Sequence, residues 1–196
     1  MNEFEDIKKQ LEVKNKEIYM NKLNLDLDNN LEVLVLTIDN VLTFIKNDAI
    51  KKILDIKESF LENEKIKVNM DKFIDSYRDN LMNLLDDKKN NLKNVLVIHD
   101  DLEICKTNLN DNYLSLKTKL EQYSTDNIIK LENELKEIFE DKFKTKRLND
   151  YLNNIFKVNL NNKILDVIKN RDVILLNTFN ETYLKYLELN KNTVGV

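Results

Sequence analysis

The residues best suited to chemistry are the only histidine of the chain and the acids beside it: His99, Asp100, Asp101 and Glu103. Imidazole and carboxylate groups bind metals and act as acids or bases in hydrolysis. On a helix His99 and Glu103 share one face, because they are four residues apart. A metal site needs at least a third ligand, and there is no HExxH motif. We interpret the cluster as a solvated polar face, and a metal-dependent helical enzyme using His99 is an alternative.

Covalent and nucleotide-dependent chemistry also lacks its usual residues. The single cysteine, Cys105, is six residues from His99, which puts the two on different faces of a helix. With one glycine, Gly195, the chain can form neither a P-loop nor a dinucleotide fingerprint. We therefore expect no catalytic residue, no metal and no cofactor. In the turns, we expect asparagine to take the left-handed positions that glycine usually fills.

One segment concentrates positive charge and is interleaved with Phe139 and Phe143; its basic residues are Lys142, Lys144, Lys146 and Arg147. Rings between basic side chains can stack on bases and bind phosphate. Two phenylalanines four residues apart are equally typical of the buried stripe of a helix, which leaves the lysines in water. The net charge of -4 gives no overall attraction to nucleic acid. A phosphate- or nucleic-acid-binding module is thus the other alternative.

Apolar residues recur at spacings of three and four, which predicts helices along most of the chain. The runs cover 20–45, 49–60, 66–84 and 92–123, and further helices are expected after capping residues at 124–127, after Thr145 and after a turn at 159–162. Weaker breaks are expected at 27–30, 46–48, 62–65 and 86–91. We expect 31–45 to be the most buried helix, since ten of its fifteen residues are apolar. A hairpin at 23–38 and a strand at 95–98 are alternatives, but both lie within longer helical runs.

These patterns predict an all-α fold, an elongated bundle of about five or six helices with coiled-coil-like packing. We expect one domain over 1–192, with 86–91 or 124–127 as the places where it could divide, and a tail at 193–196. The richness in Asn, Lys, Leu and Ile is typical of an AT-rich genome. The sequence shows no signal peptide and no apolar run long enough to span a membrane, which favours a cytoplasmic or otherwise intracellular protein.

The run from Leu92 to Tyr123 suggests a function. As one helix it would be about 48 Å long, against a diameter of about 31 Å for a compact domain of this size. Its apolar seam would then project and need a covering partner. We expect this interface at Leu109, Tyr113, Leu116 and Leu120. The sequence therefore favours a non-enzymatic structural or interaction protein that binds another chain, identical or different.

Overall fold

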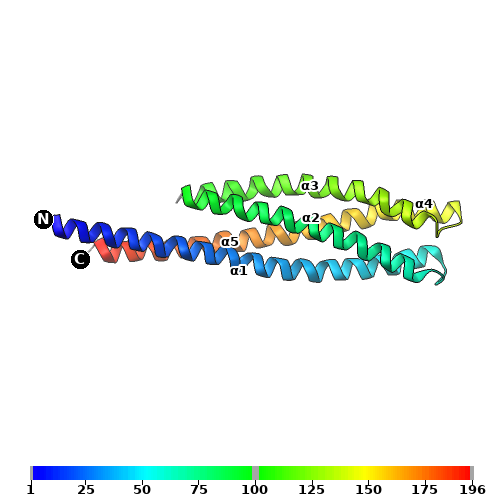
Figure 1. Cartoon of the computed structure of the whole chain (residues 1–196), viewed down its shortest axis with the longest axis horizontal. Coiled ribbons are helices and arrows are strands. Elements are labelled where there is room, and N and C mark those ends of the chain that lie inside the picture. The colour runs from blue at the N-terminus through cyan, green and yellow to red at the C-terminus, as the bar shows by residue number, and fades with distance from the viewer. Residues whose placement is uncertain (1, 99–101, 195–196) are drawn as a thin grey trace.

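The computed structural model describes residues 2–98 and 102–194, and these ranges contain helices and short connections but no strand. Four helices are long: α1 (Asn2–Lys57), α2 (Asn63–Ile98), α3 (Leu102–Lys136) and α5 (Lys157–Val194). A short helix, α4 (Lys142–Tyr151), continues through one π-helical segment, η1 (Leu152–Phe156), into α5. The predicted all-α elongated bundle is confirmed (Figure 1), with four long helices rather than five or six. Both strand alternatives are wrong, because 23–38 lies in α1 and 95–98 in α2.

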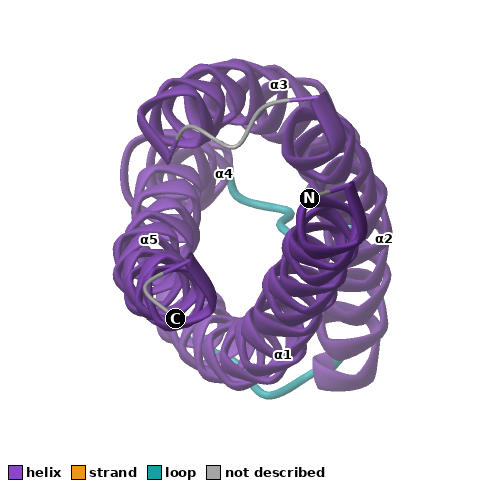
Figure 2. Ribbon diagram, turned by 90° about the vertical axis from the view of Figure 1, so that its left-hand side faces the viewer, coloured by secondary structure: helices purple, strands orange, loops and turns teal. Residues whose placement is uncertain are grey.

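The long helices lie side by side as two antiparallel pairs. Helices α2 and α3 form a hairpin, and α1 packs against α5 although the two are far apart in sequence (Figures 1 and 2). At one end α1 and α5 continue past the hairpin as a two-helix extension (Figure 1). We call this extension, residues 2–19 and 183–194, the arm, and we call the remainder the body. Within the described ranges, none of the helices carries a stretch both long and apolar enough to cross a membrane.

The prediction of one helix from Leu92 to Tyr123 is wrong. Helix α2 ends at Ile98 and α3 begins at Leu102. The run is therefore divided between two antiparallel helices, with 92–98 in α2 and 102–123 in α3. Both halves bury apolar residues at helical spacing, and periodicity alone therefore could not reveal the reversal of the chain. His99, Asp100 and Asp101 lie outside the described residues.

Most of the predicted breaks lie inside helices instead. The segments 27–30 and 46–48 belong to α1, 86–91 to α2, 124–127 to α3 and 159–162 to α5. Several of their polar residues are bonded in the core: Asn161 accepts a hydrogen bond from the hydroxyl of Tyr77 at 3.1 Å and donates one to Ser124 Oγ at 2.8 Å. The cap of α4 is Asp141, whose carboxylate accepts from the backbone N–H of Phe143, and Thr145 lies within that helix. The 62–65 break is close to the actual α1–α2 connection.

Buried residues recur every eleven residues along the long helices. The series are Leu23, Leu34, Ile45 and Ile56 in α1; Ile66, Tyr77 and Lys88 in α2; Leu109, Leu120 and Leu131 in α3; and Ile168 and Phe179 in α5. An eleven-residue repeat averages about 3.67 residues per turn, close to the 3.6 of the α-helix itself. Such a seam stays on one face of a nearly straight helix and favours a slight right-handed supercoil over the left-handed heptad coil.

A buried polar layer separates two apolar clusters of the core. In this layer Lys88 Nζ lies 2.5 Å from Asp172 Oδ1, and Asn30 Nδ2 donates to the backbone carbonyl of Arg171 at 3.1 Å. Burial raises the pKa of the Asp172 carboxyl, and the charge of Lys88 only partly opposes this. The layer favours one axial alignment of α1, α2 and α5, because a shift would leave Lys88 buried without its partner.

The turn between α1 and α2 uses no asparagine at its left-handed positions, contrary to the sequence-based expectation. Glu58 and Glu62 take these positions, with φ of 59° and 61°. The side chain of Lys57 donates a hydrogen bond to the carbonyl of Leu61 across the turn. A left-handed residue other than glycine costs roughly 1–2 kcal/mol, which the contacts of the turn must offset.

Candidate functional site

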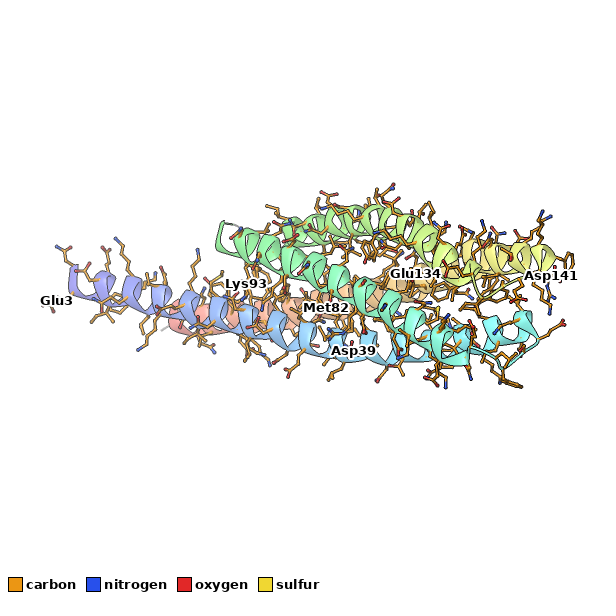
Figure 3. All side chains as sticks on the ribbon, turned by 45° about the vertical axis from the view of Figure 1, so that its right-hand side comes forward. Glu3, Asp39, Met82, Lys93, Glu134 and Asp141 are labelled. Atoms are coloured by element: carbon orange, nitrogen blue, oxygen red, sulfur yellow. The ribbon has the colours of Figure 1, made fainter. Side chains whose placement is uncertain are left out.

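The outer face of α1 carries a long stripe of exposed apolar side chains. Each of them is between 43% and 63% exposed: Ile7, Leu11, Ile18, Leu25, Val33, Leu36 and Phe44. We call these seven residues the α1 stripe. From Ile7 to Phe44 it spans about 56 Å at 1.5 Å per residue. Figure 3 shows how side chains project from α1 along its whole length, from Glu3 in the arm to Asp39 in the body.

The α1 stripe follows the same eleven-residue spacing as the core. Ile7 and Ile18 are eleven residues apart, and so are Leu25 and Leu36, and Val33 and Phe44. The stripe therefore keeps a constant angle to the buried seam of α1. The polar residues that share its face are Lys14, Lys22, Asn29 and Asn40. The result is a second seam on α1, which the rest of the described chain leaves exposed.

In the arm, α2 and α3 no longer cover the buried seam of α1. The α1 stripe is not the continuation of that uncovered seam. Leu23 and Leu27 belong to the buried seam of α1. The equivalent positions eleven residues earlier are Glu12 and Lys16, and Glu5 and Lys9 precede them on the same face. Charged residues thus replace the apolar seam where the hairpin ends. The exposed Ile7, Leu11 and Ile18 lie on a different face of the same helix.

A third face of α1 joins the arm to α5. The ring of Tyr19 stacks on Tyr186 with centroids 4.4 Å apart, and Asn15 Nδ2 donates to Asn190 Oδ1 at 3.0 Å. At the edge of the body, the hydroxyl of Thr182 donates to Asp26 Oδ2 at 2.7 Å. These contacts account for the pairing of α1 with α5 without the stripe.

Acidic residues beside the stripe are paired with bases of α2. Asp28 Oδ1 lies 3.2 Å from Lys89 Nζ and 3.5 Å from Lys93 Nζ, and Arg78 Nε donates to Asp39 Oδ1 at 2.6 Å. Partial burial would raise the pKa of Asp28, but its two lysines together outweigh burial and lower it. The flank of the stripe that faces α2 is therefore largely charge-compensated.

The residues predicted to form an interface on α3 lie mostly inside the chain. Leu109, Leu116 and Leu120 are at most 3% exposed and pack in the core, because α2 and α5 cover the helix that was expected to project. Tyr113 is partly exposed, and Lys169 Nζ lies 5.9 Å from its ring centroid. It lines a groove of about 660 Å³ between α3 and α5. The reason for expecting an interface at these leucines is thereby removed.

The predicted basic patch is only partly available to a ligand. Lys144 Nζ donates to the backbone carbonyl of Lys57 at 3.1 Å and lies 3.6 Å from a carboxylate oxygen of Glu58, which Arg147 also approaches. Lys142 and Lys146 are exposed. Cations at this position complement the carboxyl end of α1, where helix dipoles are negative. The patch therefore has a structural explanation at the α1–α4 contact.

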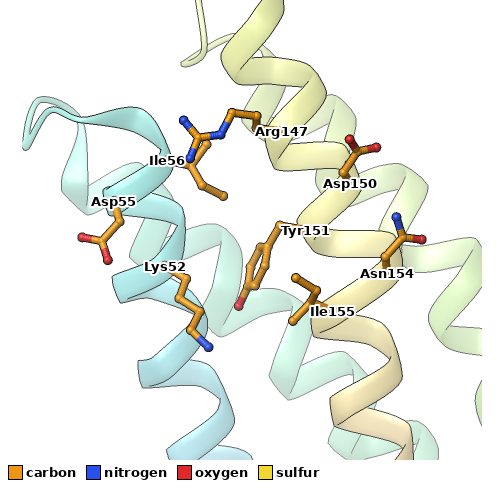
Figure 4. A pocket seen from close by; sticks show the side chains of 8 residues that line it. All are labelled: Lys52, Asp55, Ile56, Arg147, Asp150, Tyr151, Asn154 and Ile155. Atoms are coloured by element: carbon orange, nitrogen blue, oxygen red, sulfur yellow. The ribbon is translucent and has the colours of Figure 1, made fainter.

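The two phenylalanines of this segment do not form one buried stripe. Phe139 is buried, whereas Phe143 is 69% exposed. Beside them, Arg147 borders a cleft of about 440 Å³ between α1 and α4, into which the ring of Tyr151 points (Figure 4). The cleft is also lined by Lys52, Asp55 and Asp150, so positive and negative side chains are balanced and it is not a selective anion site.

The described residues hold no group of three or more His, Cys, Asp or Glu side chains that could bind a metal. Of the cluster around the histidine, only Glu103 lies in the described part of the chain. Cys105 is fully buried, as a core position of its helical run predicts.

Sequence reasoning missed the α1 stripe, although a signal for it existed. The segment 31–45 was expected to be the most buried helix, yet Val33, Leu36 and Phe44 are exposed and only four of its residues are buried. Ten apolar residues in fifteen are more than one buried face can hold. That excess was the sign of a second apolar face.

Comparison of the chain with protein-family models, curated proteins and solved structures gave no match. The function proposed below therefore rests on the fold and on the surface of α1.

Proposed function

We propose that the chain is a non-enzymatic helical-bundle protein that binds another protein chain through the α1 stripe. The observation that carries this proposal is an apolar stripe about 56 Å long on the outer face of the longest helix. Monomeric proteins rarely expose apolar patches of this extent unless a partner covers them. A helix with regularly spaced apolar residues is also suited to receive an amphipathic helix.

A protein partner fits this surface better than a lipid surface does. Helices that lie on membranes carry Lys and Arg along the polar face, where they attract anionic headgroups. Beside the stripe in the body, α1 carries Asp28, Glu32 and Asp39. The α2 bases Lys89, Lys93 and Arg78 pair with two of these acids, so that only Lys14 and Lys22 add positive charge on the face of the stripe. A protein partner can pack beside these acids if its own surface is neutral or basic there.

The proposal can be tested by capture from cells that naturally make this protein. The full chain would serve as bait in three forms: the natural sequence, Leu25→Glu with Leu36→Glu on the stripe, and Val13→Glu with Ile129→Glu as the control. The control residues are 68% and 54% exposed and lie off the stripe. Glutamate has nearly the helix propensity of leucine, so both variants should keep their helices.

We expect mass spectrometry to identify partners that the natural and control forms retain and the stripe variant loses; additional copies of this chain count among them. Retention of the same proteins by all three forms would contradict the proposal. Circular dichroism of each form checks that the loss does not reflect unfolding.

A further inference from the structure

Resting on the proposed function, we infer that the partner of the α1 stripe is the α1 stripe of a second copy of this chain, packed antiparallel about a twofold axis near Leu25. A twofold interface requires self-complementarity: if residue i contacts residue j, then j must contact i. The spacing of the stripe meets this requirement.

The apolar residues are placed almost symmetrically about the centre of the stripe. When two copies of α1 run in opposite directions with residue numbers summing to 51, Ile7 faces Phe44 and Ile18 faces Val33. In the same register the twofold axis passes between positions 25 and 26, so the two copies of Leu25 are diagonal neighbours across it. The larger ring of Phe44 is thus opposed at each end by the branched side chain of Ile7. Five of the seven stripe residues take part in these apolar pairs.

The polar residues that share the face of the stripe distinguish the antiparallel from the parallel arrangement. In the antiparallel register Lys22 faces Asn29, Leu11 faces Asn40, and Leu36 faces Asn15. A parallel, in-register pair would match all seven apolar residues with their own copies, but it would place Lys14 against Lys14 and Lys22, which pairs with Asp26 at 2.5 Å, against Lys22 within the seam. Like charges at such short range are destabilising, so the sequence favours the antiparallel pair.

The available surface suffices for a specific dimer. A helix face about 10 Å wide and 56 Å long presents roughly 600 Å² per copy, or about 1,200 Å² in total, the lower end of the range for specific interfaces. The stripe is exposed in the arm and in the body, so a second copy can lie along it without displacing α2 or α5. Equal eleven-residue spacing on both partners keeps the two seams in contact over this length.

The first experiment measures the mass of the purified full chain by light scattering and sedimentation across a wide range of concentrations. We expect the mass to rise from 23.3 kDa towards twice that value. Leu25→Glu places two carboxylates beside the twofold axis, and we expect it to raise the dissociation constant about thirtyfold or more, the effect of removing a central anchor. The control Ile129→Glu should dimerise like the natural chain.

The second experiment determines the direction of the pair and does not depend on a disruptive variant. In a Cys105→Ala background, Ile18→Cys and Val33→Cys chains are oxidised separately and as a mixture. We expect disulfide-linked dimers from the mixture but not from either chain alone, and self-linked dimers from Leu25→Cys. Self-linking of Ile18→Cys without cross-linking to Val33→Cys would show a parallel pair and overturn the inference.

The outcomes separate this inference from the proposed function. A natural chain that stays at the monomer mass at every concentration overturns the self-association inference. If the capture experiment then still yields other proteins that depend on the stripe, the proposed function stands with a different partner. If it yields none, both fail.

Discussion

The body and the arm are built from the same two helices, α1 and α5, but they are stabilised differently. In the body the seam of α1 is mostly apolar, with Asp26, Asn30 and Lys57 as buried polar residues, and it meets α2 as well as α5. In the arm the same series of positions holds Glu5, Lys9, Glu12 and Lys16, and only the contact with α5 remains. Two features of the sequence therefore mark where the hairpin ends: α2 and α3 stop there, and the seam of α1 changes from mostly apolar to charged residues.

Because of this difference, substitutions in the arm and in the body should have different effects on stability. The body has one core shared by four helices, so a defect there affects all of them. In the arm Asn15 is bonded to Asn190, and at its base Tyr19 stacks on Tyr186 and joins the second apolar cluster of the body. Regions with few buried contacts open locally at a lower free energy than the whole molecule. Three measurements test whether the arm and the body respond independently.

The largest effect is expected in the polar layer of the body. Asp172→Leu leaves the ammonium of Lys88 buried without its partner, which costs roughly 3–5 kcal/mol of unfolding free energy. We expect one cooperative transition shifted to lower denaturant concentration, because all four helices share this core. Replacing both residues, Lys88→Met with Asp172→Leu, should restore most of the loss. If the single variant unfolds as easily as the double variant, the ion pair does not control the body.

A smaller and local effect is expected in the arm. Tyr19→Leu keeps an apolar side chain but removes the ring stacked on Tyr186, a contact worth roughly 0.5–1.5 kcal/mol beyond its buried area. Amide hydrogen exchange should accelerate most in residues 2–19 and 183–194 and much less in α2 and α3, although Leu92, Leu96, Cys105 and Leu109 belong to the same core cluster as Tyr19. Equal acceleration throughout the bundle would mean that arm and body unfold as one unit.

The smallest effect is a dependence on pH that arises in the polar layer of the body. Burial raises the pKa of Asp172 above its usual 3.8, so the folded state holds this proton more tightly than the unfolded state does. The stability from this group is present below pH 3.8 and is lost as the pH rises through the folded-state pKa. Relative to the double variant, the natural chain should therefore lose stability as the pH rises through this window. A relative gain would show that Lys88 outweighs burial.

The sequence predicted the helices better than it predicted their ends. Apolar spacing identified most of the buried residues of α1 and α2, because periodicity reports which face is buried, but Phe60 at the end of the run 49–60 is 83% exposed. It could not locate the reversal between Ile98 and Leu102, because their separation of four residues continues the helical spacing and polar residues between them also fit a helix. Ser124 and Asn161 suggested a cap and a turn, but each is polar because it bonds to a distant helix. Such tertiary bonds have no signature in the local sequence.

The candidate site was missed for a related reason. Apolar content alone does not say how many faces of a helix are apolar, and the excess on α1 was assigned to a single buried face. Counting the apolar residues that remain after the core seam is filled would have left Val33, Leu36 and Phe44 unassigned. The choice between an interface on α3 and one on α1 required the helix packing.

The arm also determines how the molecule would yield to mechanical force. The outer ends of α1 and α5 lie at the same end of the molecule (Figure 1). A force that pulls these ends apart would therefore separate the two helices progressively from that end. Of the contacts described above, Asn15 with Asn190 lies nearest the tip and would break before Tyr19 with Tyr186, and Asp26 with Thr182 would follow. A load along the bundle axis would instead shear every layer of the body at once. The protein is therefore compliant to peeling at its tip and stiff along its length.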